Sequence, residues 1–226
     1  MSNDISSFRK ASLINLGKQF GLDEGKTMIA WLRERMAVFG YSGYITFKQL
    51  HKMTGKTLVI GAADVYKREM KYFSHVTEPD CQVVHAIRMS CGIPFAFTIW
   101  KYKESGYVDG AVLDNFPLQE FGKNATSESK VLGIVLHTTR TDVRVPVESL
   151  FDYADRLISM VSDKADETIL NHIPEFCSVI KIQTDREAFF SAKKKTKEKL
   201  FTVGVNTTKE FLSSNMELTH KAANAT

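Results

Sequence analysis

The chain has 226 residues, of which 43% are hydrophobic and 25% charged, a composition typical of a globular domain of ordinary size. Its net charge of +4 is too small to indicate a nucleic-acid-binding protein. No apolar run approaches the roughly 20 residues that a membrane-spanning helix needs. The first ten residues, MSNDISSFRK, lack the apolar core of a secretory signal. These features predict an intracellular protein that is soluble or peripherally attached to a membrane, with no nucleic-acid partner.

The cysteines at positions 81, 91 and 177 are odd in number and widely spaced. This pattern does not predict a disulfide framework, and reduced thiols are the simplest interpretation. Cys81 and His85 are four residues apart and could share a helix face. A single Cys/His pair without further ligands is more often structural than metal-binding. We therefore expect no metal and no other cofactor.

In the first half of the chain, the helical spacing of Met28, Leu32 and Met36 predicts a helix that ends near Gly40. The segment 46–49, Thr-Phe-Lys-Gln, fits a capping box that opens a second, short helix ending at Gly55. The apolar run 57–62, TLVIGA, is typical of a strand buried on both faces of a parallel sheet. Residues 69–74 predict a more peripheral strand, and residues 81–91 a helix that ends before Gly92.

In the second half, residues 131–136 predict another buried strand, and residues 177–182 predict a further strand. Between them, apolar residues over 150–161 predict a long amphipathic helix. Residues 195–212 predict a terminal helix, although Gly204 disfavours it. Strands that alternate with helices, without a repeat or a linker, predict an α/β fold with a mainly parallel sheet in one domain spanning residues 1–226.

Two neighbouring motifs point to chemistry. Residues 86–97, AIRMSCGIPFAF, contain a Ser-Cys-Gly-Ile-Pro helix end, and residues 107–118, YVDGAVLDNFPL, contain an Asp-Gly-Ala turn at Asp109. A lone Asp-Gly is usually only a turn. Here it follows the segment 45–65, ITFKQLHKMTGKTLVIGAADV, and the strand residues YFS in a fixed order. Together these segments resemble the C-terminal portion of the patatin-like lipid acyl hydrolases, with a motif core at about residues 45–120.

The resemblance implies a three-layer α/β/α fold that is N-terminally incomplete in this chain. It also implies ester hydrolysis of phospholipids or acylglycerols by a Ser-Asp dyad, because a serine hydroxyl needs a base within hydrogen-bond reach. By the motif, Asp109 is that base and contacts the serine without an intervening histidine. Gly110 and Ala111 are interpreted as positioning residues, with Ala111 replacing the commoner glycine of the family.

The family's nucleophile lies in a Gly-x-Ser-x-Gly turn preceded by a glycine-rich oxyanion loop, and neither occurs in this sequence. The pairs Gly17–Gly21 and Gly21–Gly25 have the glycine spacing, but Gln19 and Asp23 stand between them. Ser42 lacks the glycine spacing. Ser90 is interpreted as a structural hydroxyl that hydrogen-bonds backbone near a helix end. We expect the chain to be inactive by itself.

Three explanations for the missing nucleophile remain open. The chain is a fragment or split reading frame of a longer enzyme, or a half that is complemented by an N-terminal second polypeptide. Alternatively, it is a non-catalytic member of the family that binds lipid or a protein partner. The coding sequence directly upstream would discriminate the two hypotheses. A Gly-x-Ser-x-Gly turn encoded there would support the enzyme over the binding protein.

Two groups of residues have both a structural and a functional interpretation. Phe95, Phe97 and Trp100 lie between the two motifs and either pack in the core or line an acyl-chain channel. Near the C-terminus a lysine cluster is either a solvated helix start or a contact for anionic lipid head groups. Its members are Lys193, Lys194, Lys195, Lys197 and Lys199.

Overall fold

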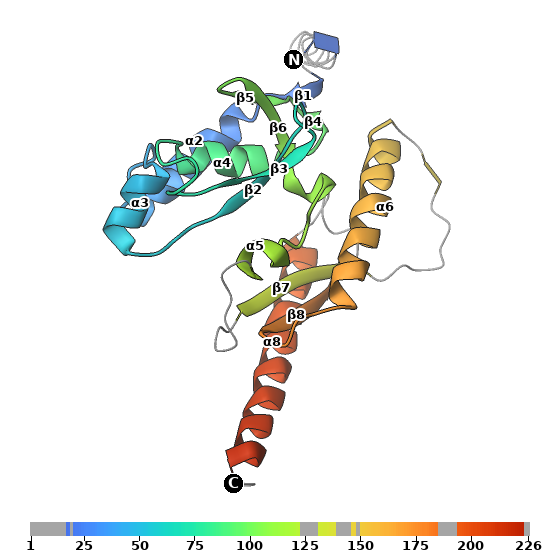
Figure 1. Ribbon diagram of the computed structural model, residues 1–226. Helices are drawn as coiled ribbons and strands as arrows, with labels where there is room; N and C mark the ends of the chain where they lie inside the picture. The colour runs from blue at the N-terminus through green and yellow to red at the C-terminus, as the bar shows by residue number, and fades with distance from the viewer. Residues whose placement is uncertain are drawn as a thin grey trace. The chain divides into compact units, whose positions relative to one another are not determined.

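The computed structural model describes residues 17–18, 20–122, 131–138, 146–147, 150–184 and 194–223 (Figure 1). Contacts divide the chain into two compact units. One comprises Met1–Pro117 and Val147–Thr168, and the other comprises Leu118–Pro146 and Ile169–Thr226. The motifs singled out above lie in the first unit.

Three helices of the first unit match the predicted ones: α2 (Lys26–Val38), α3 (Phe47–Thr54) and α4 (Val83–Ser90). The predicted capping box is confirmed, because the Thr46 hydroxyl accepts the Gln49 N–H and the Gln49 side chain accepts the Thr46 N–H. Gly55 ends α3 with a left-handed φ of 68°, which glycine adopts without steric cost.

The first unit contains a four-stranded sheet in the order β3-β2-β6-β5. Its strands are β2 (Ile60–Asp64), β3 (Glu69–Phe73), β5 (Trp100–Tyr102) and β6 (Ser105–Asp109), and every neighbouring pair is antiparallel. A second, two-stranded sheet pairs β1 (Gly21–Asp23) with β4 (Phe95–Phe97) in parallel. These two strands have three residues each, too few for periodicity to predict them.

The apolar run TLVIGA therefore has a different role from the predicted one. Its strand begins at Ile60, and both neighbours are antiparallel. The β2–β3 pair is antiparallel because the turn after β2 is tight, with the Asp64 carboxylate accepting the N–H groups of Tyr66 and Lys67. A short hairpin connection forces antiparallel pairing, and an apolar run alone does not reveal the direction of its neighbours.

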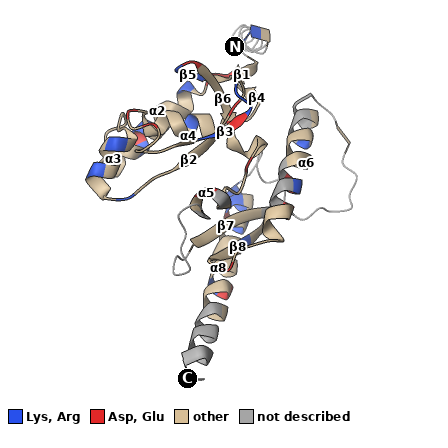
Figure 2. Ribbon diagram, in the orientation of Figure 1, with Lys and Arg blue, Asp and Glu red and all other residues tan. Residues whose placement is uncertain are grey.

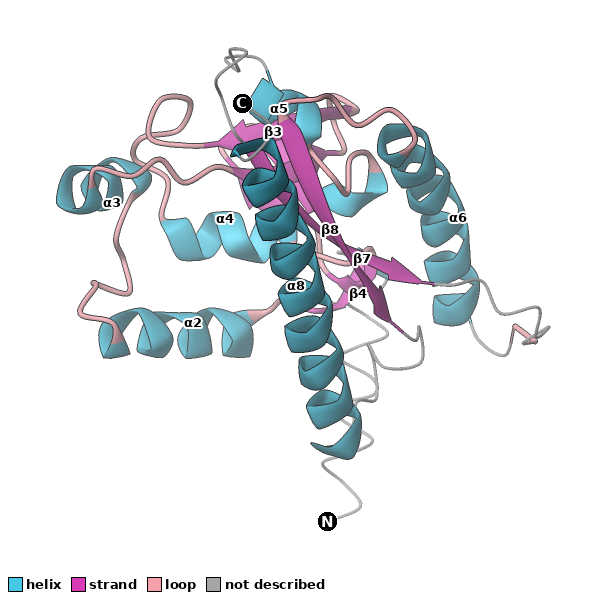
Figure 3. Ribbon diagram, turned by 90° about the horizontal axis from the view of Figure 1, so that it is seen from below, coloured by secondary structure: helices cyan, strands magenta, loops and turns pink. Residues whose placement is uncertain are grey.

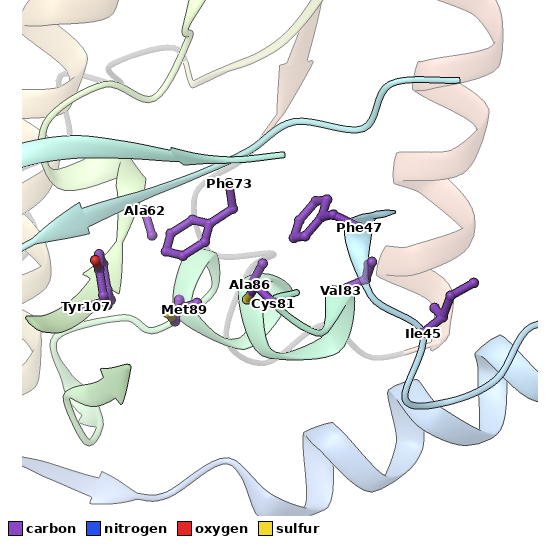
Figure 4. Packing of buried hydrophobic residues seen from close by; sticks show 9 residues of the cluster. All are labelled: Ile45, Phe47, Ala62, Phe73, Cys81, Val83, Ala86, Met89 and Tyr107. Carbon is purple, nitrogen blue, oxygen red and sulfur yellow. The ribbon is translucent and has the colours of Figure 1, made fainter. Parts of the chain in front are cut away.

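The buried core of the first unit lies between the sheet and α4, which packs against β2 and β6, while α2 packs along α4 (Figure 3). Figure 4 shows this core, in which the Phe73 ring meets the Tyr107 ring edge-on with centroids 5.2 Å apart. The fully or nearly buried members of the cluster are Ile45, Phe47, Ala62, Phe73, Cys81, Val83, Ala86, Met89 and Tyr107.

The second unit pairs β7 (Val131–Thr138) with β8 (Cys177–Thr184) in parallel, and α8 (Lys194–Ala223) packs against β8. The short α5 (Leu118–Gly122) precedes β7, and α6 (Leu150–Leu170) connects β7 to β8 in the sequence. The positions of the strands and helices predicted for this half are confirmed, and α8 continues through Gly204. The predicted burial of residues 131–136 is wrong, because alternate side chains point to opposite faces of the strand and Leu132, Ile134 and Leu136 are exposed. None of the helices in the described ranges combines the length and the hydropathy that crossing a membrane requires.

The α/β class is thus confirmed. A mainly parallel sheet is not confirmed, since three of the five strand pairings in the described ranges are antiparallel. Two of the antiparallel pairs are hairpins, β2–β3 and β5–β6, whose short turns leave no room for a crossover helix, and the third pairs β2 with β6.

The core predicts a large cost for truncating Phe73. Its side chain is fully buried, so Phe73→Ala should lower the free energy of unfolding by about 3–5 kcal/mol. Urea unfolding followed by circular dichroism measures the loss. The matched control is Phe39→Ala, because the Phe39 side chain is 76% exposed and its removal should change stability little. Equal losses in both variants would contradict this assignment of the core.

Candidate active site

Asp109 is the last residue of β6, and two hydrogen bonds fix its position. Its N–H donates to the Gly92 carbonyl oxygen at 3.0 Å, which ties the end of β6 to the end of α4. Its carboxylate Oδ1 accepts the Ala111 N–H at 2.9 Å, capping the 3-10 turn η1 (Gly110–Val112). Asp109 also stands opposite Ala62 of β2, so the carboxylate is carried by a strand with partners on both sides.

Gly110 lies where a side chain would collide with the neighbouring strand. A Cβ placed there would come within 3.0 Å of the Gly61 carbonyl oxygen and 3.2 Å of Met70 Cε. The absence of a side chain therefore lets η1 start directly against β2. Ala111 contributes its backbone N–H to the Asp109 carboxylate, which any residue other than proline can supply. Both placements support positioning roles for Gly110 and Ala111.

Burial raises the pKa of the Asp109 carboxyl above its ordinary value, and the hydrogen bond from the Ala111 N–H offsets part of this rise. A carboxylate with a raised pKa holds a proton more readily than an exposed aspartate. This is the direction that favours a general base, provided that the carboxylate is within reach of the proton it takes.

Cys91 follows α4 directly and carries an exposed thiol. Burial of its surroundings and the negative charge of Asp109 raise the pKa of this thiol, while the Arg88 guanidinium lowers it. The pKa of the Cys91 thiol therefore depends on the charges of both Asp109 and Arg88. Cys91 belongs to the Ser-Cys-Gly-Ile-Pro motif at the end of α4, but neither its spacing from other residues nor its residue type predicted a link to Asp109.

Arg88 is the functional-site neighbour that the sequence analysis missed. Its side chain is fully buried, with Nε donating to the Glu24 carbonyl at 3.2 Å and Nη2 to the Thr98 carbonyl at 3.0 Å. A Cβ on Gly92 would lie 2.9 Å from Nη1, so glycine is needed where α4 ends. An arginine in an apolar helical stretch gives no sequence signal that it turns inward.

The three aromatic residues predicted as channel candidates separate into two environments. Phe97 and Trp100 face the Arg88 guanidinium, with 4.5 Å and 5.5 Å between its Cζ and the ring centroids. Phe95 is 41% exposed and has a left-handed φ of 68° in β4. The structure thus brings Phe97 and Trp100 together around a buried cation, and Phe95 stands apart from that contact.

The remaining candidates lie elsewhere. The Ser42 hydroxyl accepts the Tyr44 N–H at 3.2 Å and closes a local turn, and Ser90 is the last residue of α4. In the lysine cluster, Lys193 is outside the described residues, whereas Lys194, Lys195, Lys197 and Lys199 are exposed on α8. Over the described ranges, no three His, Cys, Asp or Glu side chains are grouped so as to hold a metal ion.

Comparison with known families now adds to this geometry. The family model of the patatin-like phospholipases matches residues 2–121, more than half of the chain. The chain therefore belongs to the patatin-like phospholipase family, and the matched region contains α4, β6 and Asp109.

A relative in invertebrate iridescent virus 6 bears the name probable lipid hydrolase 463L. It is 29% identical over 149 residues, which cover 65% of this chain and 51% of the viral protein. This chain thus spans about half the length of that curated relative. The name lipid hydrolase is that of the viral protein, whereas the family shown for this chain is that of the patatin-like phospholipases.

The Cys91 thiol provides a test of the charge at Asp109. Asp109→Asn removes a negative charge that raises the thiol pKa, so the pKa of Cys91 should fall and its alkylation at mildly alkaline pH should accelerate. The measurement is the pH dependence of iodoacetamide labelling followed by peptide mass spectrometry. Cys81 and Cys177 are buried and serve as internal references. The control Glu104→Gln changes an exposed charge and should leave the pH dependence of Cys91 labelling unchanged. If Asp109→Asn also left that pH dependence unchanged, the effect of the Asp109 charge on the Cys91 thiol would be refuted.

The buried carboxylate also predicts a dependence of stability on pH. Because the folded-state pKa of Asp109 is raised, ionising this carboxyl group destabilises the fold, and the cost is complete above the folded pKa. The cost shrinks as pH falls below the folded pKa and is absent below the unfolded pKa. Asp109→Asn keeps an oxygen for the Ala111 N–H without the charge. It should therefore be more stable than the native chain at neutral pH, with a gain that shrinks in acid. Thermal unfolding across pH measures this difference, and a gain that grows in acid would have the wrong sign.

Proposed function

We propose that the chain contributes the base of a lipid acyl hydrolase, in which Asp109 acts on a serine nucleophile to cleave ester bonds of phospholipids or acylglycerols. The observation that carries this proposal is the placement of Asp109 at the end of β6. There its Oδ1 is held by the Ala111 N–H and its pKa is raised by burial, within a segment that matches the family.

The chemistry assigned to Asp109 is a proton transfer. As the serine oxygen attacks the ester carbonyl carbon, the Asp109 carboxylate takes the hydroxyl proton and then gives it to the departing alkoxide, which leaves as the alcohol while the acyl group stays bonded to the serine. Water then attacks the acyl-serine, and the regenerated carboxylate takes a proton from that water and returns it to the serine oxygen as the carboxylic acid leaves. Since Oδ1 accepts the Ala111 N–H, we assign the proton to Oδ2.

The serine and the oxyanion donors are proposed to come from a segment other than the residues seen here, because the sequence contains no Gly-x-Ser-x-Gly turn. This segment is either part of a longer polypeptide or a separate N-terminal half that complements the chain. We propose that the completed structure is one patatin-like domain with three layers, and that its partner is a lipid at a membrane surface. Phe95, Phe97 and Trp100 remain proposed channel residues.

A second candidate function is lipid or protein binding without hydrolysis. The absence of the serine turn from the sequence favours it. In that case Asp109 has no proton to accept, and its raised pKa is only the consequence of burial.

Ester hydrolysis separates these functions. The purified chain alone should show no turnover of a p-nitrophenyl acyl ester above buffer, because the base cannot act without the nucleophile. Adding the polypeptide encoded directly upstream, if it carries Gly-x-Ser-x-Gly, should produce turnover that is lost in Asp109→Asn and retained in the control Asp114→Asn. Turnover that survives Asp109→Asn, or no turnover with the upstream polypeptide, would reject the hydrolase assignment.

A further inference from the structure

One long stretch of the first unit contains basic residues but no acidic ones. Residues 35–63 include Arg35, Lys48, Lys52 and Lys56 but contain no aspartate or glutamate. The stretch comprises the end of α2, the turn that follows it, all of α3 and the start of β2. It differs in this respect from the chain as a whole, where acidic and basic residues are nearly balanced.

The same stretch exposes large apolar side chains. Phe39, at the end of α2, is 76% exposed, and Tyr44 and Met53 are also mostly exposed. Val76, which is 75% exposed, belongs to the turn after β3. That turn is held against α3 by the stacked rings of His51 and His75, whose centroids are 3.7 Å apart.

Helix α3 separates its two faces cleanly. Phe47 is buried and Leu50 packs against the core, so the inner face fixes the helix to the first unit. Lys48, Lys52 and Met53 lie on the exposed side. Figure 2 shows basic positions along α3, and Figures 1 and 3 both place α3 and the end of α2 at the same end of this unit.

Acidic side chains near this region do not cancel its charge. Glu78 is nearly buried and is paired with Lys71 and Lys103 at 3.1 Å and 2.6 Å. Asp80 and Glu34 are exposed, and Asp80 follows Pro79, whose carbonyl accepts the Lys48 N–H. Two exposed carboxylates thus oppose the four basic groups of residues 35–63 and Arg33, which lies over the Tyr44 ring.

We propose that this α3 surface is the face with which the protein contacts an anionic lipid membrane. The α3 surface consists of Val38, Phe39, Tyr44, Lys48, Lys52, Met53, Lys56 and Val76. At a membrane surface, exposed aromatic and aliphatic side chains can insert at the boundary between the lipid head groups and the acyl chains. The lysine ammonium groups between them can contact the lipid phosphates. The choice of a lipid occupant rests on the proposed lipid-directed function, whereas the surface itself is defined by charge and exposure.

The location of the α3 surface in the chain agrees with this role. From Lys56 the chain runs directly into β2, whose Ala62 stands opposite Asp109. A membrane that binds α3 would therefore contact the segment that leads into β2. This strand pairs with β6, which carries the proposed base Asp109. No such connection in sequence links α8, the other lysine-rich surface, to Asp109.

Vesicle co-sedimentation tests the proposal with the whole chain. Phosphatidylcholine vesicles containing phosphatidylserine should bind the protein more tightly than pure phosphatidylcholine vesicles, and added salt should weaken the binding. The combined variant Lys48→Gln/Lys52→Gln/Lys56→Gln should lose on the order of 100-fold in partition coefficient, at about fivefold for each lysine. Phe39→Ser/Met53→Ser should weaken binding to both vesicle types.

The matched control is Lys194→Gln/Lys195→Gln/Lys197→Gln on α8, which should bind as the native chain does. The proposal is overturned if only the α8 variant loses binding, if the anionic lipid brings no gain, or if the α3 variants change only the sedimentation-velocity oligomeric state. Asp109→Asn should bind normally, because binding does not use the carboxylate. Failure of the hydrolysis test and failure of the binding test are therefore separate results, and each rejects only its own proposal.

Discussion

The buried guanidinium of Arg88 is the interaction on which the candidate site depends. It joins the start of α2, through the Glu24 carbonyl, to the segment after β4, through the Thr98 carbonyl. A buried charge is costly unless it is compensated, and here two carbonyls accept from Nε and Nη2 while the Phe97 and Trp100 rings lie against the cation. Nη1 has no hydrogen-bond partner among the described residues. Gly25 and Gly92 both lie too close to Arg88 for a side chain.

This constraint reaches Asp109 through one residue. The end of α4, where Gly92 packs against Nη1 of Arg88, is also where the Gly92 carbonyl accepts the Asp109 N–H. The position of the proposed base is thus determined from the helix side by Arg88 and from the sheet side by β2. Gly110 allows the close approach to β2, and its neighbour Ala111 supplies the hydrogen bond that orients the carboxylate.

The helices and the Asp-Gly turn could be predicted from sequence because their signals are local. The capping box at Thr46 and the left-handed Gly55 are examples, and both are found where predicted. The direction of the strands beside β2 could not be predicted from the apolar run, because β3 follows a turn closed by the Asp64 side chain and β6 comes from a distant part of the sequence. The inward direction of Arg88 and the electrostatic effect of Asp109 on the Cys91 thiol are also non-local, since they arise from the packing of α4 against other segments.

The pH dependence of ester hydrolysis by the complete site is the most direct test of Asp109 as the base. The account predicts that kcat/KM falls on the acid side as one carboxyl group is protonated, with a midpoint above the ordinary pKa of aspartate, because burial raises the pKa of Asp109. An acid limb at or below that ordinary pKa, or one that persists unchanged in Asp109→Asn, would contradict the account.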